Sequence, residues 1–216
     1  MTEVAATLLL IRHGETAWNA EHRIQGRLDV PLSATGIWQT RQLAQRLADE
    51  PIDAVVSSDL ARAWMTGAPL AEARGLEMMA EPRLRERVFG IFEGKTLDEI
   101  AAQHPGELAA WRSRDVDWQV PEGESGTEFI ARVLAALHDI VLAQRGRTVA
   151  VVTHGGVLDV VYRNARALPW DAPREHLMLN ASINRLQARA APLQLEIVDW
   201  GDVGHLEQAR DELASP

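Results

Sequence analysis

Two apolar segments that lie far apart in the chain both end in a histidine followed by glycine, and this repeated arrangement restricts the folds open to it. The sequence reads LLLIRHG over residues 8–14 and VAVVTHG over residues 149–155. Unbroken apolar runs of this length are typical of strands that are buried on both faces of a parallel sheet. The carboxyl ends of neighbouring parallel strands meet at one edge, where open α/β sheets bind ligands. We therefore expect His13 and His154 to project into one crevice at that edge.

Short apolar runs alternate with helical patterns along the rest of the chain. Strands are predicted at residues 7–12, 54–57 and 148–153, and two later ones at 183–188 and 193–198 could form a hairpin or lie apart. Helices are predicted at residues 33–49, from 58 to about 74, from 125 onward, and from 156 to about 167. Ser33 and Ser58 are the expected N-caps, and Ser-x-x-Glu at 125–128 and Thr-x-x-Glu at 96–99 are capping boxes. The alternation predicts an α/β fold whose mainly parallel sheet is covered on both faces by helices.

Length and composition narrow the class of protein. A chain of 216 residues fits a single domain, here residues 1–216, with a sizeable core. Its net charge of −9 argues against nucleic acid or an anionic membrane as a partner. Without cysteine there is no disulfide, thiolate nucleophile or Cys-ligated zinc. Residues 1–3 hold an acid and no Lys or Arg, and the apolar runs are too short for an export signal or a membrane span, so we expect a cytoplasmic protein.

Residues 83–123 differ in composition from the sheet-forming segments. Several glycines and prolines interrupt this stretch, and Trp111 and Trp118 lie among them. The capping box at 96–99 predicts at least one short helix inside it. We expect an excursion, inserted between sheet elements, that covers the site and selects the substrate.

The first histidine segment has the residues that phosphoryl transfer requires. An imidazole can attack phosphorus when one ring nitrogen is unprotonated and the other is held by a hydrogen bond. Arg12 offers a planar set of donors to phosphate oxygens, and Gly14 lets the backbone approach a ligand. Arg62, about one turn into the helix after residues 54–57, is expected to face the same crevice and to favour anions there. His154 is the expected polar partner of the transferring phosphoryl group.

A phosphate ester also needs a carboxyl group that protonates its leaving oxygen. Glu86 and Glu93 both lie in the excursion and are equally plausible from the residues alone, although Glu86 could instead form an ion pair with a neighbouring arginine. Asn19, Gln25 and Gly26 follow the first histidine in a loop, where neutral amides could bind phosphate or substrate oxygens.

A metal site is the main alternative use of these histidines. His13, Glu15 and His154 could supply ligands, but the neighbouring arginines disfavour a bound cation. The other histidines have no ligand-like spacing and are expected at the surface: His22, His104, His138, His176 and His205. Trp170 and Trp200 are predicted to be packing residues.

Taken together, these segments resemble the histidine phosphatase superfamily, also called the phosphoglycerate mutase-like family, over most of the chain. The matching segments are RHGE at 12–15 with Asn19, LSATG at 32–36, SSDLARA at 57–63 with Thr66, LRE at 84–86 with Gly90, Glu93 and Gly94, and THGG at 153–156. The RHGE segment is highly specific, and the order and spacing of the others also fit the family.

The resemblance implies a three-layer α/β/α fold in which a mostly parallel central sheet carries one antiparallel strand. It implies that His13 is the nucleophile that forms a phosphohistidine, and that Glu86, rather than Glu93, is the general acid and then the base that activates water. Arg12, Arg62 and His154 complete the implied catalytic set, and no metal or other cofactor is implied. The expected substrate-binding residues are Arg12, Asn19, Gln25, Gly26, Arg62, His154 and Gly155.

Phosphatases and mutases of this family form the same phosphohistidine and differ in what accepts the phosphoryl group. The interval between Glu86 and His154 is short for a mutase, Gly-Glu-Ser at 123–125 is common in the phosphatase branch, and Arg27 stands where mutases usually have tryptophan. We therefore expect a phosphatase whose partner is a phosphorylated small molecule. A phosphoglycerate mutase that requires 2,3-bisphosphoglycerate is the second hypothesis, and a non-catalytic module that binds phosphate ligands is the third. The substrate stays open, and apolar residues on edge elements are compatible with a homodimer.

Overall fold

The predicted strands come together in one six-stranded sheet in the computed structural model, which describes residues 4–206. The strand order across the sheet is β3-β2-β4-β1-β5-β6. The strands are β1 (Ala6–Arg12), β2 (Ala54–Ser57), β3 (Met78–Ala80), β4 (Thr148–Thr153), β5 (Ile183–Ala190) and β6 (Leu193–Asp202). Residues 1–3 and 207–216 lie outside the described residues, so the predicted 1–216 domain and the expectation for residues 1–3 are not tested at those ends.

One strand runs against the others. β1, β2, β3 and β4 pair in parallel, whereas β5 pairs antiparallel with both β1 and β6. The late strands therefore form a hairpin, and the expected mostly parallel sheet with one antiparallel strand is confirmed. In the central pair, Arg12 is in register with Thr153, and the N–H of His13 donates to the carbonyl of Thr153 at 2.9 Å. The two histidines therefore leave the sheet side by side at its carboxyl edge.

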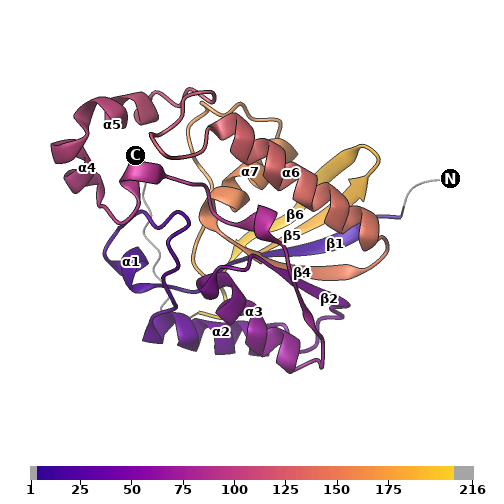
Figure 1. Ribbon diagram of the computed structural model, residues 1–216. Helices are drawn as coiled ribbons and strands as arrows, with labels where there is room; N and C mark the ends of the chain where they lie inside the picture. Colours follow the sequence, from indigo (N-terminus) through magenta and orange to yellow (C-terminus); the bar gives the residue numbers. More distant parts are fainter. Residues whose placement is uncertain (1–3, 207–216) are drawn as a thin grey trace.

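Helices cover both faces of the sheet, as Figure 1 shows. The helices α2 (Ala34–Arg46) and α3 (Ala61–Glu72) lie on one face, and α6 (Gly126–Ala143) and α7 (Gly155–Ala165) lie on the other. Successive residues of β1 point to opposite faces. Leu8 and Leu10 pack in the core beneath α6 and α7, and Leu9 and Ile11 pack in the core beneath α2 and α3. The expected three layers are confirmed.

Three of the four predicted helix caps are confirmed. The Ser33 hydroxyl accepts from the N–H of Gly36, and the capping boxes that begin at Thr96 and Ser125 both form. The prediction for Ser58 was wrong, because α3 begins at Ala61 and the buried Ser58 hydroxyl is bonded to His154. As a result, Arg62 lies in the first turn of α3, closer to the sheet edge than expected.

The excursion over residues 83–123 has a small apolar core of its own, built on Phe92, Ile100, Leu108 and Val120. It contains α4 (Leu97–Gln103), α5 (Pro105–Arg112) and a short 3₁₀ helix, Gly90–Phe92. The remaining helices are α1 (Ala17–Ala20) and the 3₁₀ helix Pro82–Leu84. Figure 1 shows α4 and α5 set apart from the sheet. Among residues 4–206, no helix combines the length and apolar character that crossing a bilayer requires.

Candidate active site

The ring of His13 is held in one tautomer. Its Nδ1 lies 2.7 Å from the carbonyl oxygen of Gly14. A carbonyl oxygen can only accept, so Nδ1 must carry the proton and Nε2 of the neutral ring keeps its lone pair. Burial, with the positive charges of Arg62 and Arg12, holds the pKa of His13 well below its ordinary value of 6.5. The imidazole is therefore neutral near pH 7 and presents an unprotonated nitrogen.

Arg62 is fully buried at the start of α3, and two backbone carbonyls hold its guanidinium. It donates to the carbonyls of Gly26 at 2.7 Å and Leu28 at 2.9 Å. Its Nε is buried and has no hydrogen-bond partner among residues 4–206. Burial lowers the pKa of Arg62 to about 10, so the group stays charged at neutral pH. A buried N–H donor that lacks a hydrogen-bond partner and lies near the nucleophile is suited to bind an anion with several acceptor oxygens.

His154 lies next to His13, with their ring centroids 5.2 Å apart. Its Nε2 is 2.8 Å from the Ser58 hydroxyl, and its Nδ1 is buried without a hydrogen-bond partner in the described part of the chain. Burial, with the positive charge of Arg62, keeps the pKa of His154 well below 6.5. His154 is the N-cap residue of α7, although its side chain makes no capping hydrogen bond, and Gly155 after it lines the cavity. The sheet edge thus gathers Arg12, His13 and His154 as expected.

The loop after His13 supplies amide groups to the same cavity. Asn19 and Gln25 are both buried and line it. The Asn19 Oδ1 accepts from the backbone of Thr16 at 3.0 Å, so its amide N–H groups are the part that can face a ligand. Gly26 has a positive φ of 53° and does not line the cavity itself. Its carbonyl instead accepts from Arg62, which makes Gly26 a support for that side chain.

The two candidate carboxylates have different surroundings. Glu86 lines the cavity, and its oxygens accept from the backbone N–H of Arg87 at 2.8 Å and of Gly156 at 3.0 Å. Glu93 is outside the cavity lining and accepts from the N–H groups of Phe89 at 2.9 Å and Arg27 at 3.2 Å. An added Cβ on Gly156 would lie 2.2 Å from Oε1 of Glu86, so a larger residue there would displace that carboxylate. The geometry therefore favours Glu86 over Glu93 as the group that can reach a ligand.

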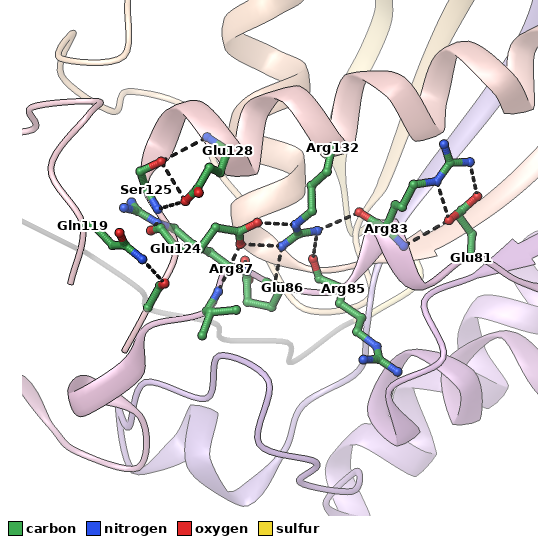
Figure 2. Close-up of polar contacts among 12 residues, drawn as sticks. Glu81, Arg83, Arg85, Glu86, Arg87, Gln119, Glu124, Ser125, Glu128 and Arg132 are labelled. Carbon is green, nitrogen blue, oxygen red and sulfur yellow. Dashed lines mark hydrogen bonds and ion pairs between the residues drawn. The ribbon is translucent and has the colours of Figure 1, made fainter. Parts of the chain in front are cut away.

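Arg132 of α6 holds the segment that carries Glu86, as Figure 2 shows. Its guanidinium donates to the backbone carbonyls of Arg83 at 2.7 Å, Arg85 at 2.8 Å and Glu86 at 2.9 Å. The same group pairs with the carboxylate of Glu124 at 2.5 Å. Sequence reasoning missed this arginine, since nothing in its local pattern distinguishes it from other helix arginines.

These groups surround a cavity of about 570 Å³, within the usual range for small-ligand sites. Besides the predicted residues, its lining includes Trp18, His22, Trp111, Arg174 and Met178. Trp18 lies in α1, Trp111 lies in α5 and the other three lie in loops, and no sequence motif connects them. Among residues 4–206, His13, Glu15 and His154 do not come together as a group that could hold a metal ion, and the Glu15 carboxylate accepts from Ser33 at 2.8 Å.

The prediction that the other histidines lie at the surface was wrong for His176. Its side chain is buried, stacked on Tyr162 with ring centroids 3.9 Å apart, and its Nε2 is 3.0 Å from Asp159. His22 and His138 are exposed, but His22 also lines the cavity. His104 and His205 are half-buried. Trp170 and Trp200 pack against the apolar core as expected.

Comparisons with known proteins agree with this geometry. The family model of the histidine phosphatase superfamily, branch 1, matches residues 8–202. A protein named "Probable phosphoglycerate mutase GpmB" from Enterobacter sp. (strain 638) is 37% identical over 208 residues, which cover 94% of this chain and 97% of that protein. A protein of the same name from Yersinia pestis (strain Pestoides F) is also 37% identical, over 212 residues, with the same coverage.

Two solved structures resemble the whole chain. Bacillus stearothermophilus YhfR has a TM-score of 0.85 and 32% identity, and the match covers 94% of this chain and all of that one (100%). A mycobacterial glucosyl-3-phosphoglycerate phosphatase, solved in complex with VO3, has a TM-score of 0.80 and 32% identity, with 90% and 98% of the two chains covered.

Proposed function

Since this chain belongs to the histidine phosphatase superfamily, we propose that it is a cytoplasmic, metal-independent phosphatase that hydrolyses small phosphate monoesters through a phosphohistidine on His13. The observation that carries the proposal is the 2.7 Å bond from Nδ1 of His13 to the Gly14 carbonyl, which leaves Nε2 unprotonated in a cavity lined by Arg12 and Arg62. The superfamily contains both phosphatases and mutases, and phosphatases are among the structures that resemble this chain.

The proposed reaction has two steps. Nε2 of His13 attacks phosphorus, the bond to the ester oxygen breaks, and Glu86 gives its proton to the leaving oxygen. Glu86 then takes a proton from water, which attacks the phosphohistidine and releases inorganic phosphate and free His13. The negative charge on the transferring group lies among Arg12, Arg62 and His154, with Asn19 and Gln25 donating to its oxygens. Gly26 contributes through Arg62, which donates to its carbonyl, and Gly155 contributes as part of the cavity wall.

A mutase is the second candidate, because relatives at 37% identity are named as such. In that case the phosphohistidine passes its phosphoryl group to phosphoglycerate rather than to water, and 2,3-bisphosphoglycerate must prime the enzyme. The short interval between Glu86 and His154 and the Arg27 side chain after Gly26 favour the phosphatase. The third candidate is a non-catalytic phosphate-binding module. Such a module would not need the neutral, oriented ring of His13.

Phosphorus NMR distinguishes these candidates. The protein is incubated in excess chelator with 3-phosphoglycerate, with and without 2,3-bisphosphoglycerate, and in a separate tube with 4-nitrophenyl phosphate. Inorganic phosphate that forms with wild type and not with His13→Ala supports the phosphatase. Formation of 2-phosphoglycerate only in the primed tube establishes the mutase instead. Full activity of His13→Ala, or no phosphohistidine in acid-quenched protein with any ester, would contradict the proposed mechanism.

A further inference from the structure

A second cavity opens beside the catalytic one, and we call it the distal pocket. It has a volume of about 290 Å³, and the residues that matter in its lining are Arg87, Phe89, Trp111, Arg114, Trp170 and Arg174. Four residues line both cavities: Phe89, Trp111, Gly156 and Arg174. Because these four residues border both cavities, the distal pocket directly adjoins the catalytic cavity.

The two cavities adjoin on the side of the proposed general acid. Gly156 lines both of them, and its N–H donates to Glu86 at 3.0 Å. In the proposed reaction Glu86 protonates the leaving oxygen, so the alcohol part of the ester lies on this side. The distal pocket is thus placed to receive the far end of that alcohol, while the phosphoryl group stays at His13.

Aromatic side chains form much of the wall. Trp111 meets Phe89 edge to face, with ring centroids 6.2 Å apart, and Trp118 and Trp170 also line the pocket. The guanidinium of Arg87 lies 5.8 Å from the ring centres of both Phe89 and Trp170. Aromatic faces of this kind pack well against a ring or an apolar body in a ligand.

Positive charge exceeds negative charge in this pocket, in a chain whose net charge is −9. Four arginines line it, but only two carboxylates do, Asp115 and Asp159. Asp159 is shared among three cationic or hydrogen-bonding groups, since Arg163 and His176 lie 3.0 Å from it and Arg174 lies 3.3 Å from it. Asp115 is exposed and accepts from a backbone N–H. Among the lining residues the arginines therefore outnumber the carboxylates, while Glu86, Glu124 and Glu128 act on Arg87 from outside the lining.

Arg114 and Arg174 have donors to spare at the pocket. The Nε of Arg174 is buried with no hydrogen-bond partner among residues 4–206. Arg114 is half-buried and donates through Nη1 to the carbonyl of Ala172 at 2.8 Å. Burial, followed by the positive charges of Arg174 and Arg163, lowers the pKa of Arg114. A bound anion would offset these positive charges.

We propose that the distal pocket binds a second anionic group on the alcohol part of the substrate, a carboxylate or a phosphate, joined to the ester through a ring or apolar body. This proposal rests on the phosphatase function proposed above, because it takes the phosphoryl group to lie at His13. It narrows the substrate class to phosphate monoesters whose alcohol is itself a bulky anion. The released product is then that anionic alcohol together with inorganic phosphate.

Three aryl phosphates with the same phenol core test the proposal. They are 4-ethylphenyl phosphate, 4-(2-carboxyethyl)phenyl phosphate and 4-(2-phosphonoethyl)phenyl phosphate. The phenol leaving groups are therefore nearly the same, and the tails differ in charge: the first is neutral, the second is a carboxylate and the third is a phosphonate. We expect kcat/KM for at least one anionic ester to exceed that of the neutral ester by roughly tenfold or more, the effect of one charge-assisted hydrogen bond. Which of the two is preferred identifies the anion.

Arg114→Gln tests whether the distal pocket is the cause. We expect it to reduce the ratio of anionic to neutral kcat/KM by about fivefold or more, mainly through KM for the anionic ester. The matched control is Arg41→Gln, the same substitution at an exposed position of α2, which should leave the ratio unchanged. A ratio near one in wild type, or a ratio that Arg114→Gln does not alter, would overturn the proposal.

Failure of this proposal differs from failure of the proposed function. Hydrolysis of all three esters at similar kcat/KM removes the distal anion site and leaves the phosphatase intact. If none of the esters is hydrolysed, the proposed function fails, and calorimetric titration of the same esters into wild-type protein still decides the pocket. Tighter binding of an anionic ester would then support an anion site, and equal affinities would reject it.

Discussion

The nucleophile and the proposed acid are held in place in different ways. His13 follows directly from β1, whose pairing with β4 and β5 involves many backbone groups. Glu86 lies in a segment outside the sheet, and the side chain of Arg132 binds three backbone carbonyls at and just before it. Many interactions therefore hold His13 in position, whereas few hold Glu86. Substitutions near His13 and substitutions near Glu86 should therefore change the activity in different ways.

The largest effect is expected for Glu86→Gln. Loss of the proposed acid should reduce turnover of an alkyl phosphate by about 10²–10⁴-fold, and reduce that of 4-nitrophenyl phosphate much less, because nitrophenolate leaves without a proton. Steady-state phosphate release with both esters measures the difference. Glu93→Gln is the matched control and should show no dependence on the leaving group. Equal losses with both esters in Glu86→Gln would mean that Glu86 is not the acid.

Arg62→Ala removes charge from the nucleophile side. The transferring phosphoryl group is negative throughout, so we expect turnover to fall by about 10²-fold or more with either ester. The loss should be similar for alkyl and nitrophenyl esters, in contrast to Glu86→Gln. Because Arg62 also binds the carbonyls of Gly26 and Leu28, thermal unfolding of the variant must be measured alongside. Unchanged turnover would show that the crevice has been assigned to the wrong place.

Arg132→Met tests the positioning role on the acid side. Removing the bonds to the Glu86 segment should lower kcat for an alkyl phosphate by roughly tenfold, with little change in KM and a smaller effect on 4-nitrophenyl phosphate. The split between the two esters is the informative measurement, because a purely structural role would lower both equally. Arg132→Lys, which keeps the charge but lacks the planar set of guanidinium donors, should recover part of the loss.

The smallest effect concerns pH. Burial and two arginines keep the pKa of His13 below 6.5, so the ring stays neutral as the pH falls through 6.5. The rate of phosphohistidine formation, measured by rapid quench, should therefore decline only below pH 6.5. In Arg62→Ala one of the charges that lower this pKa is gone, and the decline should begin at higher pH. A decline centred at or above pH 6.5 in wild type would contradict the neutral nucleophile.

His13 and His154 also make the free energy of unfolding depend on pH in a predictable direction. Both His13 and His154 have a lower pKa in the folded protein than in the unfolded chain. Below pH 6.5 the unfolded state binds more protons, so the free energy of unfolding should decrease as the pH falls and be insensitive to these groups above that pH.

Residues fixed by local pattern could be predicted from the sequence, and residues fixed by tertiary contacts could not. The apolar strand before His13 predicts its place at the sheet edge, and the resemblance selected Glu86. Ser58 looked like a helix cap because a serine before a helix usually is one, but the helix starts later and the hydroxyl bonds to His154 instead. Arg174 and the buried His176 lie in a segment without regular periodicity, where nothing local indicates what they contact.

Glu93, which is not the proposed acid, links the loop after His13 to the segment after Glu86 through hydrogen bonds. One carboxylate oxygen accepts from the N–H of Arg27, in the loop that follows the nucleophile, and from the N–H of Phe89, in the segment that follows Glu86. Moving these loops apart would strip two amide donors from one partly buried carboxylate, at a cost of about 1–3 kcal/mol for each bond. Glu93 thus couples the loop that follows the nucleophile to the segment that follows the proposed acid, and this coupling opposes changes in the separation between the attacking nitrogen and the proton donor.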